Sequence, residues 1–386
     1  MANFRTLIPL LVTLSASALL AAEPARPGQP PVDSRWYLVG NHLHTSTGGD
    51  HSWHNGLKTL LENCDKLGLD FAIVTDHNSI DHWFFPEWKT VGKTTPIHGE
   101  EWTTPDGHAG LVAYEARDGK GVILPCTRPD SGITCVNGGP NYQDMVQTVH
   151  KRGGMVIINH PKLIRHTWPD ETFGADFVDV AWNLSDPVGS RGRKWWHTQM
   201  MRGVKVGCIG GSDWHYTFGP HEKGPAPTPL SCGDGDQVAQ VNPEQGDSRI
   251  PMVPQIDKPV NLVNALDKSA DGVIAALRKN HLIVLKNVGA ARAFIGADVN
   301  GDGIFDDARE GDTVNAPVGT EIHFQARVMG GKGQTLHIID RKSDTEVAVT
   351  SDDFVTAFTR TRSDDGSFVR LELGGTGECT GNPIHY

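Results

Sequence analysis

The sequence predicts an α/β protein in which a βα barrel is followed by a small C-terminal β-sandwich. Short apolar runs at residues 71–75, 155–159 and 204–209 alternate with helical periodicity at 54–67, 142–152 and 195–202, the order expected of parallel strands joined by helices. From about residue 290, apolar and polar residues alternate, which is typical of half-buried antiparallel strands. The chain of 386 residues is long enough for both units.

The two ends of the chain and the last part of the barrel can be assigned from composition. Residues 1–22 have one early Arg5 and an apolar run too short for a membrane span, which predicts a signal peptide. A Pro-rich linker at 23–35 leads into the barrel at 36–289, and the sandwich takes 290–386. Within the barrel, 262–279 has helical periodicity and 281–285 reads as its last strand. We expect an exported protein, periplasmic or secreted, with no membrane span.

Charge and cysteine content narrow the class further. The net charge of −11 argues against binding to nucleic acid or to an anionic membrane. Six cysteines suit an oxidising compartment, and Cys126 and Cys135, which flank a short polar loop, predict a disulfide. Cys208 lies in an apolar strand, which favours a buried free thiol, and the pairing of the other cysteines stays open.

Pairs of metal-ligand residues follow two of the predicted strands. Residues 36–41 lead into His42 and His44, and residues 204–209 lead through two glycines into Asp213 and His215. Side chains two positions apart in an extended chain face the same way. Each pair therefore points together above the end of its strand.

Further candidate ligands follow other predicted strands or the turns beside them. The full set is His42, His44, His77, Glu101, His108, His160, Asp213 and His215. A βα barrel gathers the carboxyl ends of its strands at one mouth. Imidazoles and carboxylates without thiolates suit zinc, manganese or iron, and Glu101 can bridge two cations. A single His or Glu at a strand end is more often a solvated residue, but eight at successive ends are hard to place by chance.

Two bound cations would give this mouth a hydrolytic chemistry. Cations ~3.5–4 Å apart polarise a phosphoryl or acyl oxygen and deprotonate a shared water near neutral pH. Asp76, beside His77, would suit a supporting role in which a carboxylate fixes the tautomer of a ligating imidazole.

The order of the motifs resembles the polymerase-and-histidinol-phosphatase (PHP) domain, and is most similar to its branch named after carbaryl hydrolase. The resemblance covers about residues 36–285 and rests on His42-Leu43-His44-Thr45, Thr75-Asp76-His77, Gly99-Glu100-Glu101 with Gly107-His108, Asn159-His160-Pro161 and Gly210-Gly211-Ser212-Asp213-Trp214-His215. It implies a distorted (β/α)₇ TIM-like barrel, two or three divalent metal ions and phosphoesterase activity.

The resemblance also implies how the ligands are shared. One metal would be held by His42, His44 and Asp213, and Glu101 would bridge to a second held by His108 and His160. A third would be served by His77 and His215. The family usually has Asp seven residues after its first His, where this chain has Gly49 with Asp50 next to it. Asp50 and His215 are the candidate catalytic residues, Asp50 as a proton donor.

Cationic and amide side chains near the ligands are candidate substrate contacts. Lys162, Arg165 and His166 follow His160, and His221 follows His215; cations there could bind a phosphate and stabilise developing charge. Exposed, solvated charges are an equally good interpretation. Asn183 follows another predicted strand and could contact substrate or cap backbone.

A second metal signal lies in the C-terminal part. Residues Asp298, Asn300, Asp302, Ile304 and Asp306 fall at positions 1, 3, 5, 7 and 9 of a calcium loop, with Gly303 at position 6. The closing Glu is missing, because position 12 is Arg309. The pattern predicts a structural Ca²⁺, against the alternative of a plain Asp/Asn/Gly turn.

Three functions are therefore compared. The favoured one is an exported hydrolase of small phosphomonoesters or phosphodiesters, in which a metal-bridging hydroxide attacks. The second keeps the metal site but takes a carbamate, amide or carboxylic ester. The third is a non-catalytic surface module whose metals are structural.

Overall fold

The computed structural model describes residues 35–45, 56–90, 92–104, 107–116, 142–161, 168–180, 188–214, 256–364, 366–374 and 378–386. Seven strands of the first half lie side by side in chain order: β1 (Arg35–Leu43), β2 (Phe71–Val74), β3 (Thr95–Thr104), β4 (Gly107–Val112), β5 (Met155–Asn159), β6 (Phe177–Asp179) and β7 (Gly207–Ile209). The pairs β1–β2, β2–β3, β5–β6 and β6–β7 are parallel, whereas β4 runs antiparallel to β3 and β5.

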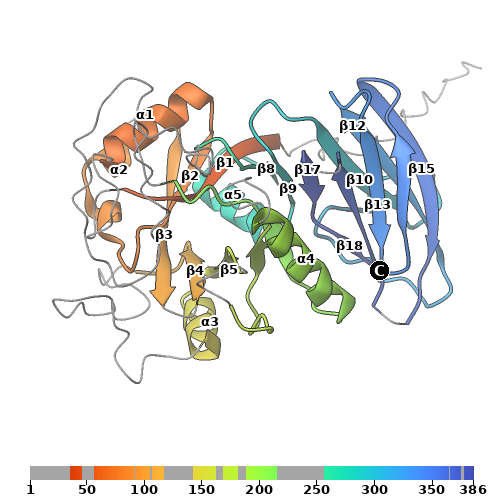
Figure 1. Ribbon diagram of the computed structural model, residues 1–386, viewed down its shortest axis with the longest axis horizontal. Coiled ribbons are helices and arrows are strands. Elements are labelled where there is room, and N and C mark those ends of the chain that lie inside the picture. The colour runs from red at the N-terminus through yellow and green to blue at the C-terminus, as the bar shows by residue number, and fades with distance from the viewer. Residues whose placement is uncertain are drawn as a thin grey trace, which may run out of the picture.

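Helices and short turns lie between consecutive strands of the chain (Figure 1). They are α1 (Leu57–Leu67), the 3₁₀ turn η1 (Asp81–Phe84), α2 (Glu87–Thr90), α3 (Tyr142–Lys151), α4 (Val188–Met201) and α5 (Ala270–Leu277). Helix α1 buries Leu57, Leu60, Leu61 and Cys64, the side chains that share one helical face. Gly68 ends it in the left-handed conformation that glycine adopts without strain. The predicted helices at 54–67 and 142–152 are thus confirmed as α1 and α3.

The strands do not form the closed barrel that the sequence predicted. The main sheet is an open path whose order ends at β7, and no ladder joins β7 to β1. The reason is that Arg35–Val39 of β1 pair antiparallel with β8 (Val260–Ala265), which in turn pairs with β9 (Leu282–Leu285). The prediction of one helix over 262–279 was wrong at its start, because those residues form β8 before α5.

The open seam between β7 and β1 is bridged by individual contacts. Beyond β7, the Ser212 N–H donates to Asn41 O at 3.1 Å and the His44 N–H donates to Trp214 O at 3.0 Å. Leu43 and Trp214 form an isolated parallel bridge. The strand ends that carry His44 and Asp213 are therefore held side by side without a continuous ladder.

Two buried amide side chains replace the missing strand pairing at β7. Asn261 of β8 accepts from Gly210 N at 2.8 Å and donates to Gly210 O at 2.9 Å. Asn382, from the C-terminal part, accepts from Cys208 N at 2.7 Å and donates to Cys208 O at 2.9 Å. Both side chains are fully buried. Each amide makes the two hydrogen bonds that a neighbouring peptide group would make.

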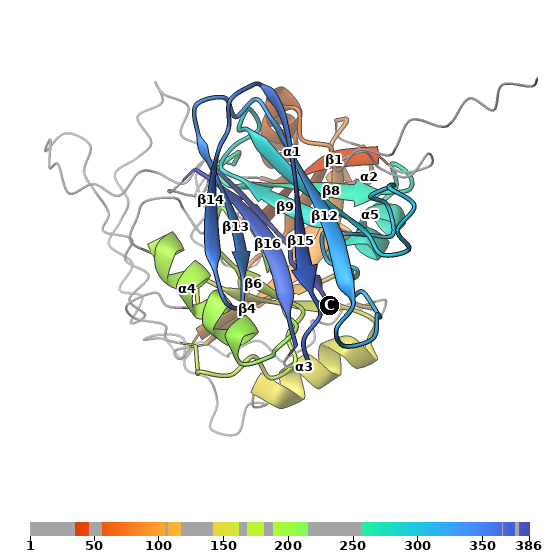
Figure 2. The ribbon, with the colours of Figure 1, turned by 90° about the vertical axis from the view of Figure 1, so that its right-hand side faces the viewer.

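The C-terminal residues form antiparallel strands, as predicted. One sheet contains β10 (Arg292–Asp298), β11 (Ala308–Arg309), β12 (Glu321–Met329) and β15 (Asp353–Thr361). The remaining strands are β13 (Thr335–Asp340), β14 (Asp344–Ala348), β16 (Phe368–Leu373), β17 (Cys379–Gly381) and β18 (Ile384–His385). Figure 2 shows β13, β14 and β16 beside that sheet. Because β17 pairs with β9, these strands continue the main sheet. A separate sandwich with its boundary at 290 stays a prediction.

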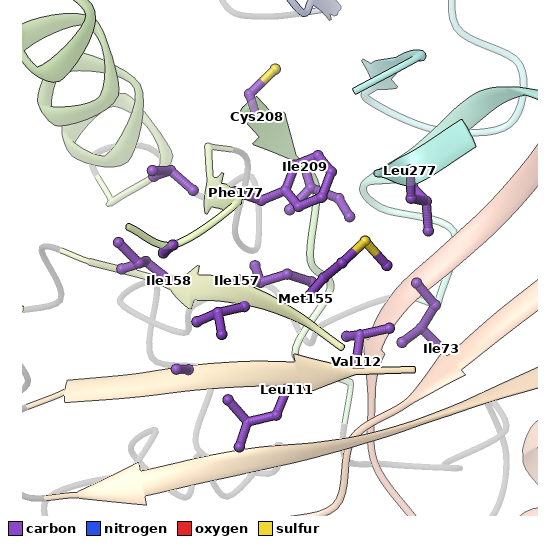
Figure 3. Close-up of a cluster of buried hydrophobic side chains, with 14 of the residues drawn as sticks. Ile73, Leu111, Val112, Met155, Ile157, Ile158, Phe177, Cys208, Ile209 and Leu277 are labelled. Atoms are coloured by element: carbon purple, nitrogen blue, oxygen red, sulfur yellow. The ribbon is translucent and has the colours of Figure 1, made fainter. Parts of the chain in front are cut away.

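The core explains why these segments become strands. Residues of β2, β5 and β9 are buried on both faces, whereas β12 alternates buried and exposed side chains. Figure 3 shows Ile157, Met155 and Phe177 packed with Ile209 and Leu277 inside the strand array. Cys64, Cys208 and Cys379 are buried free thiols, which confirms the expectation for Cys208. Among the described residues no helix combines the length and apolarity that crossing a bilayer requires.

Candidate metal centre

The predicted ligands that the structure describes meet in one place, where β1 and β5 end, with Glu101 inside β3 and His108 near the start of β4. His42, His44, Glu101, His108 and His160 are all buried, with no more than 3% of any residue exposed. His42, His160 and Asp213 have positive φ angles of 61°, 27° and 51°. Left-handed backbone at a residue other than glycine costs about 1–3 kcal/mol and gathers at functional sites. Three of the ligands are therefore held in strained backbone where their strands end.

One group of ligand atoms comes from His42, His44, Glu101 and Asp213, and these atoms lie within 4.8 Å of one another. The His42 Nε2 atom is 2.9 Å from Glu101 Oε1 and 3.2 Å from Asp213 Oδ1. His44 Nε2 is 3.3 Å from the same Asp213 oxygen. Sequence positions more than 170 residues apart thus supply one four-residue cluster.

A second group shares the same carboxylate. Ligand atoms of His77, Glu101 and His108 also lie within 4.8 Å of one another. His77 Nδ1 is 2.8 Å from Glu101 Oε2, and His108 Nδ1 is 3.3 Å from Glu101 Oε1. His160 Nε2 approaches Oε1 at 3.5 Å. The family resemblance assigned His77 to a third cation, but the structure places it with Glu101 and His108.

The charge of Glu101 depends on the imidazoles around it. Burial by itself would raise the pKa of this carboxyl, but His42, His77 and His108 lower its pKa well below the usual range. Glu101 is therefore an anion at neutral pH although none of its surface is exposed. An anionic carboxylate with each oxygen facing different imidazoles can bridge two cations.

The donor set fits divalent cations. Imidazole nitrogens and carboxylate oxygens converge here without a thiolate among the described ligands, which suits zinc, manganese or iron. Most of these donors are buried, so cations would compensate charges and lone pairs that water does not reach. His42, His44, Glu101 and Asp213 would hold one ion, and His77, Glu101 and His108 a second, with His160 at the edge of both groups.

Side chains outside the predicted set support these ligands. The Asn159 amide donates to Glu101 Oε1 at 2.8 Å. Thr103 Oγ1 lies 2.6 Å from His77 Nδ1. The sequence analysis assigned no role to Asn159. Its place at the end of β5, one residue before His160, is the feature from which a role beside the ligands could have been predicted.

Asp76 supports a different imidazole from those proposed as ligands. Its Oδ2 is 2.7 Å from His82 Nδ1, and it accepts from both the N–H and the hydroxyl of Thr45. His82 is buried and belongs to η1, so Asp76 joins the segments after β1 and β2 to this turn. That Asp76 also orients a ligating imidazole stays a prediction. Its contact with His82 was not expected, because no sequence pattern singled out His82.

Asp179 is a buried carboxylate that the sequence analysis missed. It is the last residue of β6 and 1% exposed. Its Oδ1 accepts a hydrogen bond from Gly211 N at 3.1 Å. The apolar pattern predicted a strand over 177–182 that leads into Asn183, which placed Asp179 inside the strand and not at its end.

Several candidates lie outside the described residues: the catalytic candidates Asp50 and His215, the substrate-contact candidates Lys162, Arg165, His166, Asn183 and His221, and the predicted disulfide partners Cys126 and Cys135. His215 is also the eighth predicted metal ligand. Their assignments stay predictions.

The calcium-loop pattern forms a compact turn. Asp298 accepts from Gly301 N at 2.6 Å and Gly303 N at 2.9 Å, and Asp302 accepts from Ile304 N at 2.8 Å. Glu310, one position after the missing closing residue, is buried and accepts from Ile295 N instead. Strand β11 follows the loop. Ca²⁺ binding by Asp298, Asn300, Asp302, Ile304 and Asp306 stays a prediction.

Comparison with known proteins gives weak structural similarities only. No family model matches the sequence, and no curated protein matches it. A two-domain protein from Bacteroides vulgatus containing a predicted PHP-like metal-dependent phosphoesterase is 14% identical, with 95% of this chain and 99% of that chain covered and a TM-score of 0.42.

Two other solved structures have different activities. The lesion-specific endonuclease PfuEndoQ from Pyrococcus furiosus is 12% identical, with 63% of this chain and 56% of that chain covered and a TM-score of 0.36. An amidohydrolase from Chromobacterium violaceum is 16% identical, with 46% and 87% covered and a TM-score of 0.33. Similarity at this level assigns neither family nor substrate, so function rests on the side chains of this chain.

Proposed function

We propose that this protein is an exported metal-dependent hydrolase of small phosphate esters, either monoesters or diesters. The observation that carries the proposal is the position of Glu101, whose two oxygens face different imidazoles inside one buried cluster. A structural metal site needs only one closed set of ligands. Two sets sharing a carboxylate are typical of hydrolases that handle an ester between two cations.

The residues of the chain divide the work of holding this centre. Glu101 Oε1 faces His42, and Oε2 faces His77, so that the carboxylate spans both groups. Asp213 Oδ1 lies between His42 and His44. When bound, divalent cations would polarise the ester and lower the pKa of water beside it. The surrounding buried residues exclude bulk water, which strengthens the electrostatic interactions within the site.

The predicted substrate contacts favour an anionic ester. Lys162 and Arg165 come shortly after His160 in the sequence, and His221 comes shortly after His215, so these cations would lie at the rim and bind a phosphate oxygen. Asn183, four residues after β6 in the sequence, would contact substrate, and Asp50 or His215 would donate the proton to the leaving group. These roles are proposals, as are the third cation and the signal peptide at 1–22.

The first test is elemental analysis of protein purified without added metal, followed by a substrate panel on the same sample. The panel sets aryl phosphate monoesters and diesters beside aryl carbamates, amides and carboxylic esters. We expect about two divalent ions per chain and turnover of a phosphate ester. Turnover of carbamates, amides or carboxylic esters alone would replace the substrate class, and metal without any turnover would favour the binding module.

Glu101→Gln tests the bridging carboxylate directly. The amide keeps the size of the side chain but removes the charge, and its NH₂ group cannot ligate, so metal content should fall below one ion per chain and kcat/KM at least about 100-fold. Asp340→Asn, which neutralises a buried carboxylate in β13, is the matched control and should keep both. Unchanged metal content in Glu101→Gln would contradict the proposed site.

A further inference from the structure

Asp179 is a buried carboxylate at the mouth that the proposed reaction does not use. It ends β6 beside β7, where the Val180 N–H donates to Ile209 O at 3.0 Å. One of its oxygens, Oδ1, accepts from the N–H of Gly211 at 3.1 Å. Gly211 lies two residues before Asp213, so Asp179 is joined to the turn that presents one of the candidate ligands.

His42 needs a partner on its far side. Its Nε2 faces the cluster, at 2.9 Å from Glu101 and 3.2 Å from Asp213. Its other ring nitrogen, Nδ1, is buried and makes no hydrogen bond within the part of the chain that the structure describes. A ligating imidazole almost always donates this second N–H to a carboxylate, a carbonyl or water.

Gly211 lies beside both that nitrogen and the second oxygen of Asp179. A Cβ atom added at Gly211 would be 2.8 Å from Asp179 Oδ2, 3.0 Å from His42 Cβ and 3.2 Å from His42 Nδ1. The Oδ2 edge of Asp179 and the Nδ1 edge of His42 therefore border the same small space beside Gly211. Only a glycine at position 211 leaves this space open. The choice of residue at this position is therefore as constrained as the choice of the ligands.

We propose that Asp179 is a positioning residue of the metal centre, which orients His42 through Nδ1 and the Asp213 turn through the Gly211 N–H. The carboxylate holds the proton on Nδ1, which leaves the Nε2 lone pair directed at the cation. It thereby fixes ligands from β1 and β7 relative to each other. This inference rests on the metal centre of the proposed function and is independent of its substrate.

Asp179→Asn separates this role from a merely structural one. The amide oxygen of Asn can still accept from Gly211 N, so a residue that only held the turn would be replaced without loss. The neutral amide, however, is a much weaker acceptor for Nδ1–H and does not raise the basicity of the ring. Cation affinity should therefore fall while the fold is kept.

The experiment is calorimetric titration of Mn²⁺ into the full chain stripped with chelator. We expect Asp179→Asn to weaken the tightest Mn²⁺ site by about 10–100-fold, the range found for carboxylates that support a ligating histidine. Asp340 is a buried carboxylate far from the centre in sequence, so the Asp340→Asn variant should bind Mn²⁺ as tightly as the wild type does. An affinity for Asp179→Asn within about twofold of the wild type would overturn the proposal.

Gly211→Ala provides the second variant, in case Asp179→Asn does not fold. Its new methyl group would enter the space between Asp179 Oδ2 and His42 Nδ1 and should weaken Mn²⁺ binding in the same direction, with circular dichroism unchanged. Full affinity in a folded Gly211→Ala would also overturn the proposal. Both readouts measure binding, so a protein that binds Mn²⁺ normally but hydrolyses no phosphate ester would refute the proposed function and leave this inference intact.

Discussion

At the scale of single residues, the centre depends on side chains that orient the ligands as well as on the ligands. Asn159 is 2% exposed and donates to Glu101 Oε1 at 2.8 Å. This hydrogen bond occupies one lone pair of Oε1 and aims the other into the cluster. Removing a buried donor also leaves the carboxylate less well solvated.

Asn159→Ala should therefore lower kcat/KM for the substrate found in the panel by about tenfold and weaken Mn²⁺ binding. Asn159→Asp has the same shape but no donor, so it should lose at least as much if donation is what matters. Steady-state kinetics and calorimetry measure both. Full activity in Asn159→Asp would mean that Asn159 only fills space.

At the scale of elements, the seam beside β7 is where the fold depends on side chains in place of a strand. The Asn382 amide meets the N–H and the C=O of Cys208 and also donates to Leu282 O at 3.1 Å. Asn382→Ala would leave these buried backbone groups without partners, at about 1–3 kcal/mol for each unsatisfied group.

We expect Asn382→Ala to lower the free energy of unfolding by about 2–4 kcal/mol, measured by urea denaturation of protein stripped of metal. Asn315→Ala, at an exposed position, serves as the control and should change stability by less than about 0.5 kcal/mol. Equal stability of the two variants would show that the seam does not need this amide.

At the scale of the whole molecule, stability should depend on pH through a carboxyl far from the metal centre. Burial raises the pKa of Glu310 from 4.5 to about 7. Between these values the folded state binds a proton that the unfolded state has released, so stability falls as pH rises through this window. The penalty is fully present above about pH 7.

Glu310→Gln should remove this penalty, because the amide oxygen can still accept from Ile295 N. Relative to the wild type, the variant should gain stability progressively from about pH 4.5, reaching at most about 3 kcal/mol by pH 8. Urea denaturation across this range measures the difference. Burial and Lys205 lower the pKa of His385 to about 4, which favours the folded state as pH rises; comparing the two proteins cancels this effect. If the free energies of unfolding of the two proteins change with pH in parallel, the prediction is contradicted.

The sequence indicated which side chains lie together at the candidate site better than it indicated the strand pairing that holds them. His42 and His160 follow buried apolar runs, and such runs have a local signature that survives without tertiary information. The antiparallel pairing of β1 with β8 has no such signature, because it joins residues more than 220 positions apart. The buried roles of Asp179 and Asn382 were missed for the same reason: they depend on which strand lies alongside, and periodicity within one segment does not specify its neighbour.

The amide of Asn382 also bears on how such a protein could have arisen. A gene rearrangement that separated the residues after about 290 from the rest would remove the Asn382 amide from the backbone N–H and C=O of Cys208 and loosen the strand leading to Asp213. The segments before and after about residue 290 are then expected to be inherited together. A homologue without the C-terminal segment would need another hydrogen-bonding group beside β7 to keep the candidate metal centre in place.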